Sequence, residues 1–197
     1  EHGLDDYYVD NVDMSLYIGH GNGNGFTFET GMDDDNLTYL DAQAGEAWGN
    51  RDLEFQAWLS CQVLRETASG LTWDQRWGPS FNGLHLICAF QTNAAVGKEK
   101  LFKYFGEEMF DDKRTVKNSW FNAVEDYQPN DVEAVVMGVL ITDDQDSKGN
   151  YNSVDSSISG LRRAHWNDHM WKGGSPSPGT DVPKGKKAGY WRVVYTV

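Results

Sequence analysis

Apolar runs predict strands that alternate with helices along most of the chain. Residues 14–18 and 84–90 are short apolar runs typical of buried strands, and residues 53–59 alternate apolar and polar side chains with a period of two. The almost continuous apolar run 132–142 predicts a strand that is covered on both faces. Together with a closing strand over residues 190–195, these segments favour an α/β sheet with helices on its faces.

Helical spacing of apolar side chains marks the segments between these strands. Residues 98–110 and 116–124 place large apolar side chains at helical intervals. Residues 62–69 are good helix formers that stop at Gly70, so we expect a helix that begins directly after Cys61. Because the chain has no internal repeat and no linker, we expect residues 1–197 to form a single α/β domain.

The acidic side chains lie mainly in the first half of the chain. The 197 residues carry a net charge of −13, and residues 1–97 hold 3 Arg, no Lys and 15 acidic residues, a net of −12. Binding of phosphate requires clustered Lys and Arg, so this distribution argues against a nucleic-acid partner and against an anionic membrane surface. No apolar run reaches the roughly 18 residues that a membrane span needs.

The first residue and the cysteines bear on the compartment. The chain begins with Glu1 and not with Met, so we interpret it as a processed chain. Cys61 and Cys88 can form at most one disulfide and cannot alone fill a structural zinc site. Together with the acidic, Trp-rich and Lys-poor first half, these features favour an extracellular, secreted protein.

Candidate chemistry lies where two of the predicted strands end. His20 follows the first strand and Cys61 follows the second, and α/β sheets bind ligands at the carboxyl ends of their strands. A helix N-terminus and a nearby imidazole both favour the reactive thiolate, so His20 could serve Cys61 as general acid and base. The amides of Gly21 and Cys61 would then form an oxyanion hole. In the alternative interpretation, Cys61 is a core residue and His20 is a turn residue.

The order of these elements resembles that of the caspase-like cysteine peptidases, the group that contains caspases, legumains, clostripain, gingipains and separases. An apolar run precedes His20-Gly21, and a second one ends in Ser60-Cys61, 41 positions after the histidine (61 minus 20). The resemblance implies a three-layer sandwich with a mostly parallel sheet, with His20 as the catalytic histidine, Gly21 as an oxyanion-hole amide and Cys61 as the nucleophile. The chain also resembles a poorly characterised bacterial and archaeal group with Gly-His-Gly and Ser-Cys.

The resemblance also implies elements ahead of the His-Gly strand. Caspase-like folds normally have two strands and a helix there, whereas His20 follows only nineteen residues. We therefore expect this chain to lack the first strands of that sheet. A cleaved N-terminal fragment or a longer precursor would supply them, unless the chain builds its sheet without them.

Two acidic segments are candidates for calcium. Asp144, Asp146 and Asp155 approximate a calcium-binding loop, with Asp155 twelfth counted from Asp144, although Lys148 stands where an oxygen ligand is wanted. The run Asp33–Asp35 is a second candidate. In both cases the alternative is a solvated acidic loop. Calcium is the one cofactor that the sequence suggests.

Two further sets of residues have competing interpretations. His165 and His169 would share one face of a helix and could bind a metal, but the flanking arginines and aromatic residues also favour a packing surface. Cys88 is most simply a core residue, and a Cys61–Cys88 disulfide would abolish the nucleophile. The glycines around His20 lack the Gly-Lys-Ser/Thr of a phosphate loop, so we discount nucleotide binding.

Two functions from different classes follow from these patterns. The first is a cysteine endopeptidase that acts on peptides or proteins with His20 and Cys61. The second is a non-catalytic extracellular structural or filament-forming protein, which retains a peptidase-like fold and binds copies of itself. Many Trp and Tyr side chains would suit contacts between such copies.

Overall fold

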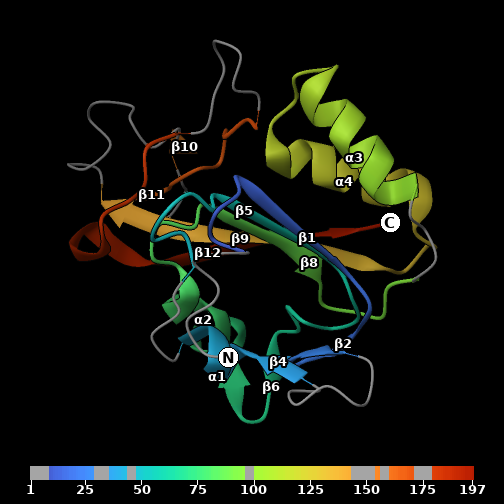
Figure 1. Ribbon diagram of the computed structural model, residues 1–197, viewed down its shortest axis with the longest axis horizontal. Coiled ribbons are helices and arrows are strands. Elements are labelled where there is room, and N and C mark those ends of the chain that lie inside the picture. The colour runs from blue at the N-terminus through green and yellow to red at the C-terminus, as the bar shows by residue number, and fades with distance from the viewer. Residues whose placement is uncertain are drawn as a thin grey trace.

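Seven strands form one mixed sheet through the centre of the protein (Figure 1). The computed structural model describes residues 9–28, 36–43, 48–95, 100–142, 154–155, 160–170 and 179–197. Along the sheet the strands are β1 (Met14–Ile18), β5 (Phe55–Leu59), β8 (Leu86–Phe90), β9 (Glu133–Thr142), β11 (Leu161–Arg163) and β10 (Val154–Asp155), and β12 (Lys187–Thr196) pairs with β9. The expected α/β fold is confirmed.

The sheet is mixed and not mostly parallel. The pairs β1/β5 and β5/β8 are parallel, whereas β8/β9, β9/β11, β11/β10 and β9/β12 are antiparallel. The pairing changes from parallel to antiparallel at β9, because the chain leaves the end of β8, forms two helices and returns to that same end of the sheet. Gln91, just after β8, donates its backbone N–H to the carbonyl of Glu133 at the start of β9, at 3.0 Å.

The two edges of β9 are occupied differently. β12 pairs with β9 along almost its whole length, from Glu133 to Ile141. The other edge is shared by two strands, because β8 covers Ala134 to Gly138 and β11 covers Leu140 to Thr142. β11 and β8 therefore run end to end in the same direction, and they meet opposite Val139.

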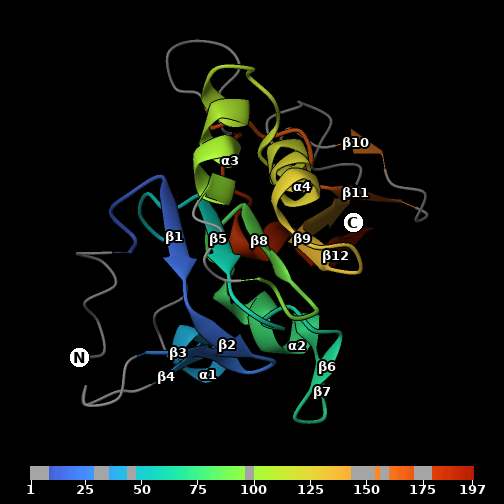
Figure 2. The same cartoon turned by 90° about the vertical axis from the view of Figure 1, so that its right-hand side faces the viewer.

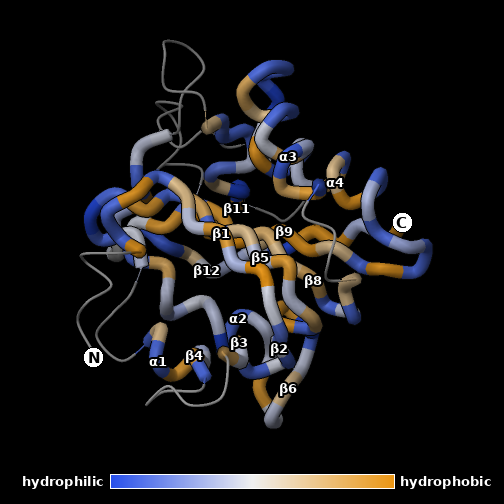
Figure 3. Tube along the Cα trace, turned by 45° about the vertical axis from the view of Figure 1, so that its right-hand side comes forward, coloured by the Kyte–Doolittle hydropathy of each residue, from blue (hydrophilic) through white to orange (hydrophobic). Residues whose placement is uncertain are grey.

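Helices cover both faces of the sheet (Figure 2). On one face α3 (Lys100–Phe110) and α4 (Val116–Tyr127) pack on Phe55, Ala57, Leu86, Cys88 and Phe90. The opposite face carries Trp58, Ile87 and Val135 beneath α1 (Tyr39–Gln43), α2 (Trp73–Trp77) and a small sheet of β2 (His20–Asn22), β3 (Gly25–Thr27) and β4 (Asn36–Thr38). All five residues of β5 and of β8 are buried, and Figure 3 shows apolar residues concentrated along these strands.

Helix α4 begins where the sequence provides a cap. Thr115 has an extended backbone, and its hydroxyl accepts the backbone N–H of Asn118 at 3.3 Å, which satisfies one of the free amides of the first turn. Val116, Trp120, Ala123 and Val124 then fall on one buried face, as the helical spacing predicts. Both helices expected between β8 and β9 are therefore confirmed.

The helix expected over residues 62–69 does not form. Residues 61–64 make a turn, and a short hairpin of β6 (Thr67–Ala68) and β7 (Leu71–Thr72) follows. The amides of Gln62 and Leu64 bond to the carbonyls of Thr92 and Phe90 beyond β8, at 2.9 and 3.0 Å. Gln62 also has a left-handed φ of 60°, so local helix propensity is overridden by bonds to a neighbouring strand.

In the described part of the chain, the remaining regular elements are two short 3₁₀ turns, Gly78–Ser80 and Lys184–Lys186. Among the described helices, none is long and apolar enough to cross a membrane.

Candidate functional site

The parallel pairing of β1 with β5 brings His20 and Cys61 to the same edge of the sheet. Ile18 pairs with Leu59 at the last position of each strand, and the Gly19 N–H donates to the Leu59 carbonyl at 3.2 Å. His20 and Cys61 each lie two residues beyond that last pair. The parallel arrangement that the sequence required for a dyad is therefore present.

The histidine side of this edge is a tight hairpin. The backbone of His20 starts β2, and Tyr17 fixes the base of the hairpin by donating its hydroxyl to the carbonyls of His20 and Thr27 at 3.2 and 3.0 Å. A Cβ on Gly21 would lie 2.1 Å from the hydroxyl oxygen of Ser60. Only glycine fits there, so the hairpin packs directly against the residue before Cys61.

The cysteine side is held by the end of β8. Cys61 is half-buried and free, and its Sγ lies 3.5 Å from the Ala94 carbonyl, which accepts the thiol hydrogen. The neighbouring Gln62 has a left-handed backbone, and its side-chain Nε2 donates a hydrogen bond to Asn93 Oδ1 at 2.8 Å. Cys88 is also free and buried in β8, so the disulfide is absent, and burial raises the pKa of the Cys88 thiol.

Arg76 of α2 connects the two sides. Its fully buried guanidinium donates to the Gly23 carbonyl in the histidine hairpin and to the Arg65 carbonyl in the cysteine loop. It also reaches the Val63 carbonyl at 3.4 Å, and the adjacent Trp77 donates its indole N–H to that oxygen at 2.9 Å. Burial lowers the pKa of Arg76 to about 10, so the side chain stays charged at neutral pH.

A shallow pocket opens beside the histidine. Its volume is about 370 Å³, and six residues line it: Tyr17, Ile18, Gly19, His20, Thr27 and Phe28. Cys61 is not part of this lining. The pocket therefore offers a largely apolar and aromatic surface on the histidine side of the edge.

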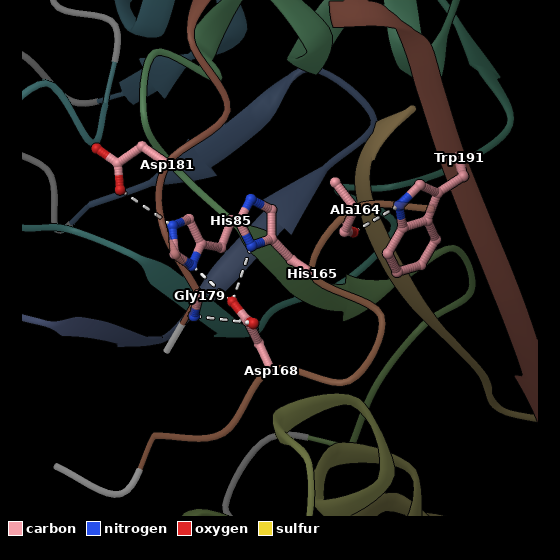
Figure 4. A network of polar contacts seen from close by, with 7 residues as sticks. All are labelled: His85, Ala164, His165, Asp168, Gly179, Asp181 and Trp191. Carbon is pink, nitrogen blue, oxygen red and sulfur yellow. Dashed lines mark hydrogen bonds and ion pairs between the residues drawn. The ribbon is translucent and has the colours of Figure 1, made fainter. Parts of the chain in front are cut away.

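A second cluster of polar residues lies at the opposite end of the parallel strands, where β8 begins (Figure 4). His85 immediately precedes β8, and its ring stacks on that of His165, with centroids 3.6 Å apart and planes 10° from parallel. Both rings place Nδ1 on Asp168 Oδ2, at 2.7 Å from His85 and 2.9 Å from His165. His85 Nε2 lies 3.2 Å from Asp181 Oδ1.

This cluster forms because β8 and β11 meet end to end on β9. Ala164 follows β11, and its N–H donates to the Val139 carbonyl at 2.9 Å, opposite the start of β8. His165 then adopts a left-handed φ of 61°, which turns its ring onto His85. The Gly179 N–H donates to Asp168 Oδ1 at 3.0 Å, so both oxygens of this carboxylate accept hydrogen bonds.

The histidines of the cluster titrate differently. Burial alone would lower the pKa of His85, but its hydrogen bonds to Asp168 and Asp181 and the charges of both carboxylates raise it to about 9. Burial and the positive charge of His85 lower the pKa of His165 to about 4. Burial would raise the pKa of Asp168, but the two histidines hold it well below its usual range.

The other predicted metal sites have different outcomes. Asp144, Asp146 and Asp33–Asp35 lie outside the described residues, and the backbone of Asp155 pairs with Arg162 between β10 and β11. Residues 164–167 form turns and not the helix that would align His165 with His169. Another group of carboxylates, Asp13, Asp52 and Glu54, lies ahead of β1 and β5.

Sequence reasoning missed the partnership of His85 with His165 and Asp168. The available signal was the polar ring of His85 within the apolar run 84–90, because a polar side chain buried in a strand needs a partner. Its partners lie 80 and 83 positions further along the chain (165 minus 85 and 168 minus 85). Residue spacing does not reveal a contact of that range.

One comparison with known proteins gives a match. The model of a family described as "Domain of unknown function (DUF6345)" matches residues 1–195. No curated protein and no solved structure matches the chain.

Proposed function

The chain belongs to the family described as a domain of unknown function, DUF6345, and we propose that it is a cysteine-dependent peptide hydrolase with Cys61 as nucleophile and His20 as its acid and base. The observation that carries this proposal is the parallel register of β1 and β5, in which each residue follows its strand by the same distance at one edge of the sheet. A free, half-buried thiol at that edge supports it further.

The order of the strands supports a caspase-like arrangement within the proposal. The histidine strand β1, the cysteine strand β5 and the next strand β8 are parallel neighbours in chain order, with helices on both faces of the sheet. We propose on this basis a three-layer sandwich of the caspase-like type. β1 is its edge strand among the described strands, at the place where further strands of such a sheet would pair.

The proposed reaction depends on His20 for activation of the thiol, because no helix begins at Cys61. His20 takes the thiol proton, and the thiolate forms a bond to the carbonyl carbon of the scissile amide. His20 then returns the proton to the departing amine, which leaves a thioester on Cys61. Water, deprotonated by His20, hydrolyses this thioester to a carboxylate and restores the thiol.

Backbone amides near the dyad support an oxyanion hole. Gly23 and Asn24 form the two-residue turn of the β2–β3 hairpin, and Asn22 pairs with Gly25. In such a hairpin the next pair, Gly21 with Phe26, exchanges no ladder hydrogen bonds, so the Gly21 N–H points away from β3. We propose that it and the Cys61 N–H bind the carbonyl oxygen as negative charge develops on it.

Labelling of the thiol tests the proposal. The protein is treated with a radiolabelled iodoacetamide and assayed against a mixed fluorogenic peptide library, alongside Cys61→Ala, His20→Ala and Cys88→Ala. We expect labelling at Cys61, cleavage that is lost in the first two variants, and both properties retained in Cys88→Ala, since Cys88 is fully buried. Cleavage that survives Cys61→Ala, or no cleavage by the unmodified protein, contradicts the proposal.

The exposed edge of β1 favours a second candidate function, that of a structural protein that binds copies of itself. Leu16 and Ile18 are 50% and 43% exposed, and β1 pairs only with β5 among the described strands. An unpaired edge with apolar side chains can accept a strand from another chain. Sedimentation as a large assembly that Leu16→Lys disperses, without peptide cleavage, would favour this function over the hydrolase.

A further inference from the structure

Alternate residues of β1 direct their backbone groups away from the sheet. The carbonyl of Asp13 and the N–H of Gly19 bond to β5, at 3.0 and 3.2 Å, so the odd-numbered residues face that strand. In a strand the N–H and C=O groups of successive residues point to opposite sides. Those of Leu16 and Ile18 therefore point to the outer edge of β1, where none of the described strands pairs with it (Figure 2).

The pocket beside His20 lies at the carboxyl end of this outer edge. Its lining includes Ile18, the last residue of β1, and His20 itself. Tyr17 and Phe28 contribute aromatic rings that meet edge to face, with centroids 5.7 Å apart. The Tyr17 hydroxyl already bonds to two backbone carbonyls, and Phe28 is 37% exposed. The pocket therefore offers its aromatic surface to an apolar side chain.

A free strand edge beside an apolar pocket suits an extended peptide. When a peptide adds to a sheet edge, its main chain bonds to the edge strand and pockets select among its side chains. Successive side chains of the added strand lie on opposite faces of the sheet. Those on one face would lie beside Leu16 and Ile18, which are 50% and 43% exposed and would be covered by the peptide.

Acidic groups at the amino end of β1 favour a basic residue in such a peptide. Carboxylate oxygens of Asp13, Asp52 and Glu54 lie within 4.8 Å of one another. Asp13 precedes Ile18 by five positions (18 minus 13), which is about 17 Å of strand. A basic side chain about five residues away from the one in the pocket would therefore lie near these carboxylates, and the opposite charges would fix the register of the peptide.

We propose that the outer edge of β1 and the pocket bind an extended peptide with an apolar residue at its amino end and a basic residue about five positions later. Its role rests on the proposed hydrolase. His20 returns the proton to the departing amine, so the part of the substrate that begins with this amine lies on the histidine side. This part runs antiparallel to β1, from Ile18 towards Met14, with its first side chain in the pocket.

Peptide binding to Cys61→Ala, which needs no turnover, tests the proposal. The probe is a hexapeptide with a free amino terminus, a leading phenylalanine, four threonines, a final lysine and a fluorophore at its carboxyl end. Binding is followed by fluorescence anisotropy. We expect a one-to-one complex that is weakened at least about tenfold by glycine in place of phenylalanine and up to about fivefold by glutamate in place of lysine. Equal affinity for the phenylalanine and glycine probes overturns the proposal.

Two further comparisons locate the peptide on the protein. In one, the backbone amides of the probe are methylated either at its second and fourth residues or at its third and fifth. Only one of these two probes should lose binding, because alternate amides face β1. In the other, Phe28→Ala should weaken binding, whereas Phe110→Ala, at an exposed phenylalanine of α3, is the matched control and should not. Equal binding by both methylated probes, or equal effects of the two variants, contradicts the assignment.

Cleavage and sedimentation separate this proposal from the two proposed functions. A preference of the unmodified protein for phenylalanine over glycine directly after the scissile bond supports both the hydrolase and the peptide site. Selective binding without any cleavage contradicts the hydrolase and supports the peptide site. Cleavage without that preference overturns the peptide site alone. A large assembly that the probe does not disperse means that a second copy of the chain occupies the edge, which also overturns the peptide site.

Discussion

His85 and His165 stack with their ring centroids 3.6 Å apart, and the two rings carry a single positive charge between them from about pH 4 to about pH 9. His85 keeps its proton up to a pKa of about 9, and His165 accepts one only at a pKa of about 4. In contact, the rings titrate as a pair and not as two separate groups.

This pairing predicts a stability maximum near neutral pH. The pKa of His85 is raised from about 6.5, so its contribution is complete below that pH and is lost as the pH rises through about 9. The pKa of His165 is lowered, so its contribution is present above about 6.5 and is lost as the pH falls towards about 4. Urea unfolding measured from pH 4 to 10 should show both losses.

Asp181→Asn should separate the alkaline loss of stability from the acid loss. Removal of one carboxylate lowers the pKa of His85, so the alkaline loss should begin at a lower pH while the acid side changes little. An alkaline side that is identical in the variant and the unmodified protein would show that His85 is not responsible for it.

Arg76 should be essential for the stability of the edge that holds His20 and Cys61. Arg76→Ala removes the donor to the carbonyls of Gly23 and Arg65, both of which its guanidinium holds in the interior. We expect a loss of at least about 2 kcal/mol in the free energy of unfolding, measured in urea, because buried acceptors lose their partner. Arg65→Ala, at an exposed side chain, is the control and should stay within about 0.5 kcal/mol.

Gly21→Ala should displace the histidine hairpin. Its Cβ would lie 2.1 Å from Ser60 Oγ, so we expect slower alkylation of Cys61 and a destabilisation of about 1–3 kcal/mol. The hydroxyl of Ser60 is buried without a hydrogen-bond partner among the described residues, so Ser60→Ala alone should cost little. The double variant should recover part of the lost stability. No recovery would mean that the clash involves other atoms.

Gly106→Ala provides a contrast in which alanine should stabilise the protein. Gly106 lies within α3, and a Cβ there would meet no atom within 4 Å. Alanine favours the helix over glycine by up to about 1 kcal/mol, so the free energy of unfolding in urea should rise by this order. A decrease would contradict the open space that surrounds this position.

Much of the sheet was predictable because its core strands are short apolar runs, as in residues 86–90. The positions of His20 and Cys61 were predictable for the same reason, since each directly follows such a run. The helix after Cys61 was wrong because the amides of Gln62 and Leu64 bond to residues beyond β8, a contact that local propensity does not contain. The His85 cluster depends on a left-handed turn at His165, which the residue type does not dictate.

The end-to-end meeting of β8 and β11 on one edge of β9 has a dynamic consequence. The two strands share a neighbour but no ladder with each other, so residues 160–170 can detach while β8 keeps its bonds to β5 and β9. His85 would remain with the sheet, and His165 and Asp168 would leave together. The amide hydrogens of β11 should therefore exchange with solvent through this local opening, well before the domain unfolds and faster than those of β8.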